Sequence, residues 1–497
     1  MHLSDCLGGY SFYEENPPVS AEMLEQPRFV DRGQVTADTL ANTQAKILEI
    51  NSKTGLYPLY VVYSIFRARC DEYAENELTL EKQNELWAKT VQENIFVICK
   101  TRMAKFITKR TLVGYRKISI NAHYFDDLIN TMQNKQRQFV ERVLKPSYWN
   151  RSGDRMKFNA VVGNPPYQIM DGGAQASAKP VYNYFVEQSE ALNPDYVSMI
   201  MPARWYVGGK GLDSFRDKMI NDKRFVVLHD FVNSNACFTN VDIKGGICYF
   251  LWDKHHEQKC CIHRHENEEI IVSSRYLVEE GENIHIRYFE LISIKNKVFS
   301  IATQSFEEFV SSMKPYGLRG DVFKDTKKYG LPAFSKVPVE NGYRIIGLNN
   351  LKREYRYIPA TYPLPKTDML LDYKVFITRN YGMGDFGDMP ADPIVALPGD
   401  LCTETFVQIG AFDTKQEAEN VIKYLKTRFF RAMVSLRKQD QGASKAVYHY
   451  VPMQDFTVNS DIDWNMSIDD IDDYLFKKYN LSVEEISFIT SKVKKIG

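Results

Sequence analysis

"KFNAVVGNPPYQ", residues 157–168, joins a short run of apolar, strand-forming residues to an amide, two prolines and a phenol. The apolar run predicts a buried strand that ends at Gly163. Ligands of open α/β sheets bind just beyond the carboxyl ends of such strands. The residues that follow Gly163 are therefore expected where a ligand would bind.

Residues 164–167 together could form a binding site for an amino group on a planar ring. Asn164 offers a side-chain carbonyl acceptor. The rigid Pro165–Pro166 pair can fix the Pro165 carbonyl as a second acceptor, and Tyr167 supplies a flat face. Such a site could hold an exocyclic amine with its lone pair directed at an electrophile. The alternative is a turn that only ends the strand and leaves Tyr167 in solvent.

Further apolar segments of similar length alternate with helical patterns on both sides of this strand. They are residues 46–50, 94–100, 116–122, 196–202, 225–231 and 243–253. The alternation predicts an α/β fold with a mostly parallel, seven-stranded sheet. We expect an irregular lead-in over 1–27, a separate α+β domain over 290–460, and a helical tail over 461–497 with N-caps at Ser467 and Ser482.

The bulk composition describes a folded protein with a balanced surface. Of 497 residues, 44% are hydrophobic and 13% aromatic, which is ample for sizeable cores. The 63 basic and 63 acidic residues cancel, which argues against a general polyanion binder and permits local basic patches. Eight cysteines without a C-x-x-C pair favour a reducing cytoplasm and no metal site. We find no signal peptide and no apolar run long enough for a membrane helix.

With the N-P-P-Y motif after this strand, the sequence resembles the adenine-N6 DNA methyltransferases of the gamma class. It is most similar to the methylase portion of type IIG-like restriction–modification enzymes. The resemblance implies a Rossmann-like, S-adenosylmethionine-dependent catalytic domain over 28–275 and a DNA target recognition domain over 290–460. It also implies that Asn164 and Pro165 hold N6 of an adenine flipped out of double-stranded DNA, with Tyr167 stacked on the base.

The resemblance assigns the cofactor to residues upstream of the motif. "ILEINSKTG", residues 47–55, is similar to the family's first S-adenosylmethionine motif, with Glu49 as the acid and Gly55 in the turn. Thr36 matches a segment that contacts the methionine end of the cofactor. Asn121 is the best match for the contact to its adenine, with Asp126 and Asp127 as alternative candidates.

Two departures from the family pattern concern the same pocket. The interior "INSKT" of the first motif lacks a second glycine, and Cys99 stands where the second motif carries an acid. A thiol cannot replace a carboxylate that accepts two ribose hydroxyls. A methylase-like DNA-recognition subunit with a decayed cofactor pocket therefore remains an alternative. A protein glutamine-amide methyltransferase, which shares N-P-P-Y, is a second one.

The resemblance also places the target base and the DNA. Phe238 matches an aromatic residue that packs on the flipped base opposite Tyr167. A basic and polar loop near residue 440 carries the side-chain types that read base edges. Its candidate DNA contacts are Arg437, Lys438, Gln439, Gln441, Ser444 and Lys445. Because we find no nuclease motif and no P-loop, cleavage or translocation would require a partner nuclease or helicase subunit.

Overall fold

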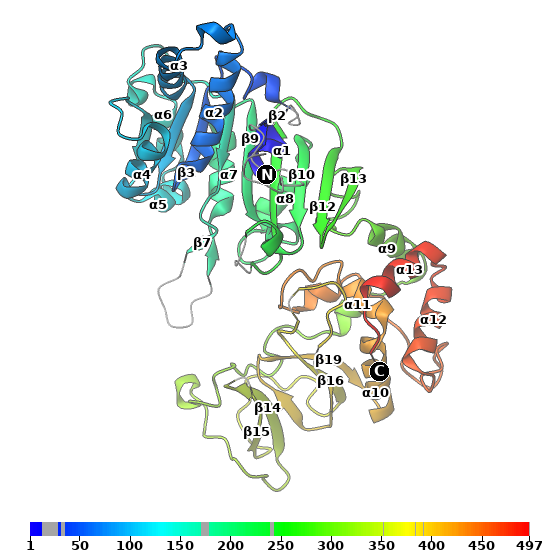
Figure 1. The fold of residues 1–497 in the computed structure, drawn as a ribbon. Coiled ribbons are helices and arrows are strands. Elements are labelled where there is room, and N and C mark those ends of the chain that lie inside the picture. Colours follow the sequence, from blue (N-terminus) through cyan, green and yellow to red (C-terminus); the bar gives the residue numbers. More distant parts are fainter. Residues whose placement is uncertain are drawn as a thin grey trace, which may run out of the picture. The chain divides into compact units, whose positions relative to one another are not determined.

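The computed structural model describes residues 1–11, 28–30, 35–169, 178–238, 243–350, 352–382, 384–390 and 392–496. The chain divides into two compact units, Met1–His285 and Ile286–Gly497 (Figure 1). In the part of the chain so described, no helix has the length and apolar character needed to cross a bilayer.

The first unit is built on a nine-stranded sheet of order β13-β12-β10-β11-β9-β6-β3-β4-β5. Its strands are β3 (Ile47–Ser52), β4 (Ile95–Cys99), β5 (Asn121–Tyr124), β6 (Ala160–Gly163), β9 (Tyr196–Pro202), β10 (Phe225–Phe231), β11 (Ile247–Asp253), β12 (Cys260–Glu266) and β13 (Glu269–Arg275). From β5 to β9 all neighbours are parallel, whereas β11 runs antiparallel between β9 and β10. The mostly parallel sheet is confirmed.

The sheet differs from the prediction in two respects. The hairpin β12–β13 adds two strands beside β10, so the predicted number of seven is wrong for the whole sheet. Strand β5 also begins only at Asn121, later than expected. Ile118 and Ile120 pack at the margin of the core without joining a strand. The alternating apolar residues at 118 and 120 are partly buried, but burial does not require that their backbone pairs with a neighbouring strand.

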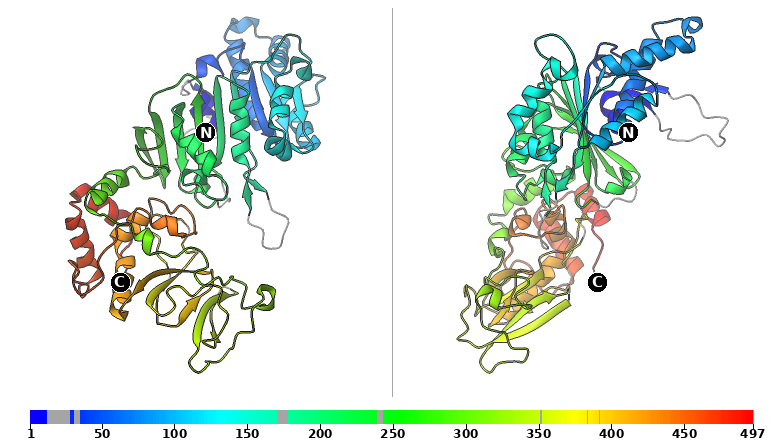
Figure 2. Two further views of the ribbon diagram at one scale, coloured as in Figure 1. Left: turned by 180° about the vertical axis from the view of Figure 1, so that it is seen from behind. Right: turned by 90° about the vertical axis from the view of Figure 1, so that its left-hand side faces the viewer.

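Helices cover both faces of this sheet because its central strands are apolar on both faces. Leu48 and Ile50 belong to one hydrophobic core, and Ile47 belongs to the other. The second face carries α1 (His2–Leu7), α2 (Leu56–Cys70), α3 (Leu80–Glu93) and α4 (Arg102–Val113). The first carries α5 (Leu128–Asn134), α6 (Gln136–Val143), α7 (Tyr182–Ala191) and α8 (Asp213–Asn221). Figure 2 shows the two helical layers edge-on.

The first residues of the chain are ordered structure, contrary to the predicted irregular lead-in. Helix α1 buries Leu3, Cys6 and Leu7 and packs against β9 and β11. Strand β1 (Gly9–Ser11) then pairs with β2 (Arg28–Val30). The rest of the predicted lead-in, residues 12–27, lies outside the described residues.

The second unit combines small sheets with helices. One sheet has the order β15-β14-β18 and the other β17-β16-β19. Its strands are β14 (Tyr343–Asn349), β15 (Lys352–Ile358), β16 (Tyr373–Thr378), β17 (Ile394–Ala396), β18 (Asp400–Cys402) and β19 (Phe406–Phe412). Its helices are α9 (Glu290–Ile301), α10 (Lys415–Lys426), α11 (Arg428–Val434), α12 (Ile468–Lys478) and α13 (Val483–Lys492). Ser467 and Ser482 cap α12 and α13, as predicted.

The strand order creates a crevice between β3 and β6. The chain leaves β3 through α2 and α3 and returns as β4 on one side, while β6 pairs with the other side of β3. Ile50 near the end of β3 lies opposite Gly163 at the end of β6. Such a topological switch point is where α/β sheets bind ligands.

Candidate active site

The N-P-P-Y segment is held in place by two hydrogen bonds from other parts of the unit. The side-chain amide of Asn51 donates to the Asn164 backbone carbonyl at 2.7 Å. The Val181 amide donates to the Tyr167 carbonyl at 3.2 Å. Asn51 adopts a left-handed φ of 74° at a bulge in β3, and this conformation suits asparagine better than most residues. The turn after β3 therefore positions the turn after β6.

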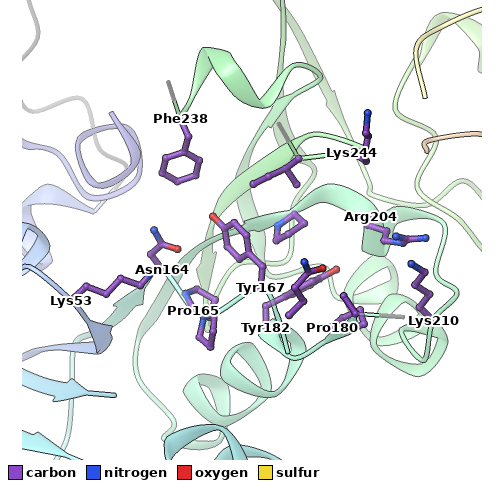
Figure 3. Close-up of a pocket in the computed structure, with 15 residues that line it drawn as sticks. Lys53, Asn164, Pro165, Tyr167, Pro180, Tyr182, Arg204, Lys210, Phe238 and Lys244 are labelled. Carbon is purple, nitrogen blue, oxygen red and sulfur yellow. The ribbon is translucent and has the colours of Figure 1, made fainter. Parts of the chain in front are cut away.

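The motif lines a cavity of about 660 Å³, a size typical of ligand pockets. Asn164, Pro165, Pro166 and Tyr167 all face it, as does Phe238 (Figure 3). The Tyr167 hydroxyl is buried and has no hydrogen-bond partner among the described residues. Burial raises the pKa of this phenol well above its ordinary value, so the ring stays neutral. The alternative of a solvent-facing tyrosine is wrong.

Phe238 lies across the cavity from Tyr167, as drawn in Figure 3. Its amide donates to the Ser234 carbonyl at 2.8 Å, which holds it at the end of a short 3₁₀ turn after β10. Tyr167 comes from the turn after β6. Two aromatic rings from different strand ends thus share a cavity with the Asn164 amide.

The first predicted cofactor motif lies at the carboxyl end of β3. Glu49 is 5% exposed, and its Oε2 atom has no partner among the described residues. Burial raises the pKa of this carboxyl to about 8, against the opposing effects of Ser52 and Lys53. The Asn51 Oδ1 atom is likewise buried without a described partner. Buried oxygens without a described partner on two residues of β3 suit a bound group that donates hydrogen bonds.

Gly55 begins α2 in a left-handed conformation, with φ of 80°. A Cβ atom at this position would lie 2.9 Å from the Thr108 Cα of α4. The glycine is therefore required by backbone conformation and by the approach of α4. It lets the turn 51–55 close over the end of the sheet.

The donor and acceptor set fits S-adenosylmethionine at one end and departs from it at the other. The buried oxygens of Glu49 and Asn51 suit the ammonium of the methionine portion, whose positive charge would favour the ionised form of Glu49. Cys99 ends β4 fully buried, near Thr108 Oγ1 at 3.9 Å. Burial raises the pKa of this thiol to about 12, so no anion is available there for a ribose diol.

Two of the predicted cofactor residues are not brought to this place. The buried Thr36 hydroxyl donates to the Leu7 carbonyl at 2.9 Å, because α1 and its following turn pack against it. Asn121 begins β5, and its amide donates to the carbonyls of Gln92 and Ile95, where β4 begins. That is the amino end of the parallel strands, opposite the crevice. We withdraw both assignments.

The predicted DNA-reading loop is partly internal to the second unit. Lys438 is 4% exposed and its ammonium pairs with the Asp388 carboxylate at 2.8 Å. Gln439 is also buried. Neither side chain can reach DNA in this conformation, so these two assignments are wrong. Arg437 is half-buried over the Tyr450 ring.

The remaining candidates in this loop are accessible to different degrees. Gln441 and Ser444 are exposed, and Lys445 is half-buried. These residues and Arg437 stay predictions.

Sequence reasoning missed several residues that the structure gathers around the motif. They are Asn51, Lys53, Tyr182 and Lys244. A sequence signal was available for Asn51 and Lys53, because both lie in the segment "INSKT" that departs from the family's first cofactor motif. The others come from segments whose proximity only the fold establishes.

Comparisons with known proteins agree with this geometry. Residues 93–238 match the family model described as Eco57I restriction-modification methylase. An uncharacterized adenine-specific methylase from Mycoplasma pneumoniae is 35% identical over 119 residues, which is 23% of this chain and 28% of that protein. The chain thus spans little more than a quarter of the length of this relative.

The fold has a counterpart among solved structures. The type IIL restriction-modification enzyme MmeI in complex with DNA is similar with a TM-score of 0.50 and 10% identity. The similarity covers 91% of this chain and 68% of that one.

Strand order, switch-point pocket and N-P-P-Y motif define an α/β domain of the methylase class. Residues 93–238 are thus similar to the Eco57I restriction-modification methylases, and the matched relative is described as an adenine-specific methylase. The predicted resemblance to adenine-N6 methyltransferases is thereby confirmed.

Proposed function

We propose that this chain methylates adenine N6 at a specific site in double-stranded DNA, with S-adenosylmethionine as methyl donor, after flipping the base. The observation that carries the proposal is the shared cavity of Asn164, Pro165, Tyr167 and Phe238. The side-chain carbonyl of Asn164 and the carbonyl of Pro165 would accept the two N6 protons. This directs the nitrogen lone pair out of the ring plane, and positioning replaces activation by a metal.

The two aromatic rings supply the binding energy for an extruded base. Stacking of one base on an aromatic side chain contributes about 1–3 kcal/mol, which offsets part of the cost of unpairing. Tyr167 needs only its ring for this, since its hydroxyl has no described partner. Glu49 and Asn51 would hold the ammonium of the cofactor, which supplies an electrophilic methyl group when bound.

Methyl transfer to unmethylated plasmid DNA tests the proposal. We expect label from S-adenosylmethionine to appear as N6-methyladenine after digestion. Asn164→Ala should reduce the rate by about 100-fold or more, the usual effect of losing one transition-state hydrogen bond. Asn134→Ala, on an exposed position of α5, is the matched control and should leave the rate unchanged.

Variants of Tyr167 separate stacking from packing. Tyr167→Phe should keep the rate within a few-fold, because only an unsatisfied hydroxyl is removed. Tyr167→Ala should raise KM for DNA and lower the rate. Label in a protein fraction instead of DNA would contradict the proposal and favour a glutamine-amide methyltransferase.

A second candidate function is supported by Cys99. Because a buried thiol replaces the ribose-binding acid, the chain could recognise DNA without transferring a methyl group. Calorimetric titration with S-adenosylmethionine decides between the two. Measurable binding supports the methyltransferase, and no binding together with retained DNA affinity supports the recognition subunit.

A further inference from the structure

The pocket of the N-P-P-Y motif has a one-sided charge. Among the described residues that line it, the charged side chains are all basic: Lys53, Arg204, Lys210 and Lys244. Adenine itself is neutral, so the base is not the kind of group that a basic lining attracts. Concave sites lined by one sign of charge concentrate ions of the opposite sign.

Three of the cations lie away from the cofactor motif. Figure 3 draws Arg204, Lys210 and Lys244 on the far side of Tyr167 from Asn164 and Lys53. Lys53 belongs to the turn after β3, next to the acceptors expected to hold the cofactor. The three distant cations are therefore drawn apart from the residues expected to hold the cofactor.

Lys210 is presented by an unusual loop. Gly208, Gly209, Lys210 and Gly211 all have positive φ, at 76°, 80°, 51° and 84°. A non-glycine residue in this conformation is uncommon and often marks a functional loop. Added Cβ atoms at Gly209 and Gly211 would meet nothing within 4 Å, so packing does not demand these glycines. The loop keeps its backbone open around the lysine.

A second lysine-glycine segment faces the same cavity. Lys244 precedes Gly245 and Gly246, whose φ angles are 86° and 80°. The Gly246 carbonyl accepts a hydrogen bond at 3.1 Å from the amide of Ala203, the neighbour of Arg204. The segments that carry Lys244 and Arg204 are thus fixed to each other. Glycine-rich turns with basic side chains are well suited to close approach of a phosphate.

We propose that Arg204, Lys210 and Lys244 form a clamp for the backbone phosphates beside the flipped adenine. The clamp rests on the proposed function, because it holds the strand whose base enters the pocket. Phosphate contacts set register and orientation and carry no sequence information. The clamp therefore positions the target nucleotide, while sequence is read elsewhere.

The salt dependence of DNA binding tests the clamp directly. The probe is a labelled duplex with one adenine opposite an abasic site, since an unpaired base enters the pocket at little cost. Each phosphate contact contributes about 0.9 to the slope of log affinity against log salt. The triple variant R204A/K210G/K244A should lower that slope by about two to three. Glycine is used at 210 because it accepts the positive φ.

Two controls separate the clamp from general charge and from the base pocket. K89A/K135A/K145A removes three exposed cations of the same unit and should leave the slope unchanged. Tyr167→Ala should weaken binding at every salt concentration without changing the slope. Circular dichroism confirms that each variant is folded.

The outcomes distinguish the clamp from the proposed activity. An unchanged slope in the R204A/K210G/K244A variant overturns the clamp even if the wild-type protein methylates adenine. An equal fall of the slope in the control triple variant overturns it as well. A selective fall supports the clamp, and it does so even where the wild-type protein transfers no methyl group, a result that would remove only the proposed activity.

Discussion

At the scale of single residues, the site contains buried polar atoms that have no hydrogen-bond partner among the described residues. Glu49, Asn51 and Tyr167 each hold a buried oxygen without a described partner. Such atoms cost folding free energy, about 1–3 kcal/mol each, unless a ligand satisfies them. Their concentration around one crevice is a physical reason to expect a ligand there.

The Glu49 carboxyl makes folding stability depend on pH. Burial raises its folded-state pKa to about 8 from the ordinary 4.5. Its contribution is therefore fully present below about pH 4.5 and is lost as pH rises through about 8. Where Glu49 alone titrates, stability should fall by up to about 1.4 kcal/mol per pH unit.

Urea unfolding across that pH window measures the effect. Glu49→Gln should flatten the profile relative to wild type, because an amide does not titrate. Glu81→Gln, at an exposed position in α3, is the control and should reproduce the wild-type profile. Identical slopes in wild type and Glu49→Gln would show that Glu49 is not protonated in the folded protein.

At the scale of elements, α1 is part of the folded core and not a lead-in. His2 Nε2 lies 2.8 Å from Ser198 Oγ of β9, and the Tyr249 hydroxyl of β11 donates to Asp5. Leu7, the last residue of α1, is fully buried. A helix of six residues has little stability alone, so tertiary contacts hold it.

Removing the Leu7 side chain should destabilise the first unit by about 2–5 kcal/mol, the cost of a large-to-small change in a packed core. Leu56→Ala is the control, because this leucine is 64% exposed and should change stability by less than about 0.5 kcal/mol. Tryptophan fluorescence during urea unfolding measures both, as only Trp464 lies beyond residue 285. Equal effects would mean that α1 is not packed as described.

At the scale of the whole molecule, each unit has a hydrophobic core built from its own described residues. Both cores that enclose the nine-stranded sheet use residues up to Leu277 and Val278 only. The core around Phe376 and Leu401 draws on the second unit alone. Each unit therefore has the main requirement for folding by itself.

A fragment of residues 1–285 should unfold cooperatively and bind S-adenosylmethionine as the full chain does, because the pocket residues all belong to it. It should lose site selectivity on plasmid DNA if the second unit reads the sequence. Urea unfolding and mapping of N6-methyladenine are the measurements. A fragment that lacks a cooperative transition would show that the first unit depends on residues after 285.

Much of the fold and the motif was predictable, because local pattern and backbone chemistry determine them. The apolar runs that became β6, β9 and β10 must be buried, and Ser467 and Ser482 begin helices because their hydroxyls satisfy free amides. The Asn164–Tyr167 motif is continuous in sequence, so its chemistry could be recognised without a structure.

The tertiary structure alone decided which distant residues meet and which are buried. Asn51 and Asn164 are 113 positions apart and meet because β3 and β6 are neighbours. Thr36 and Lys438 have suitable chemistry for binding, yet packing of α1 and the Asp388 ion pair use it internally. Residue type and spacing determine what a side chain can do, whereas strand order and burial determine whether a ligand can reach it.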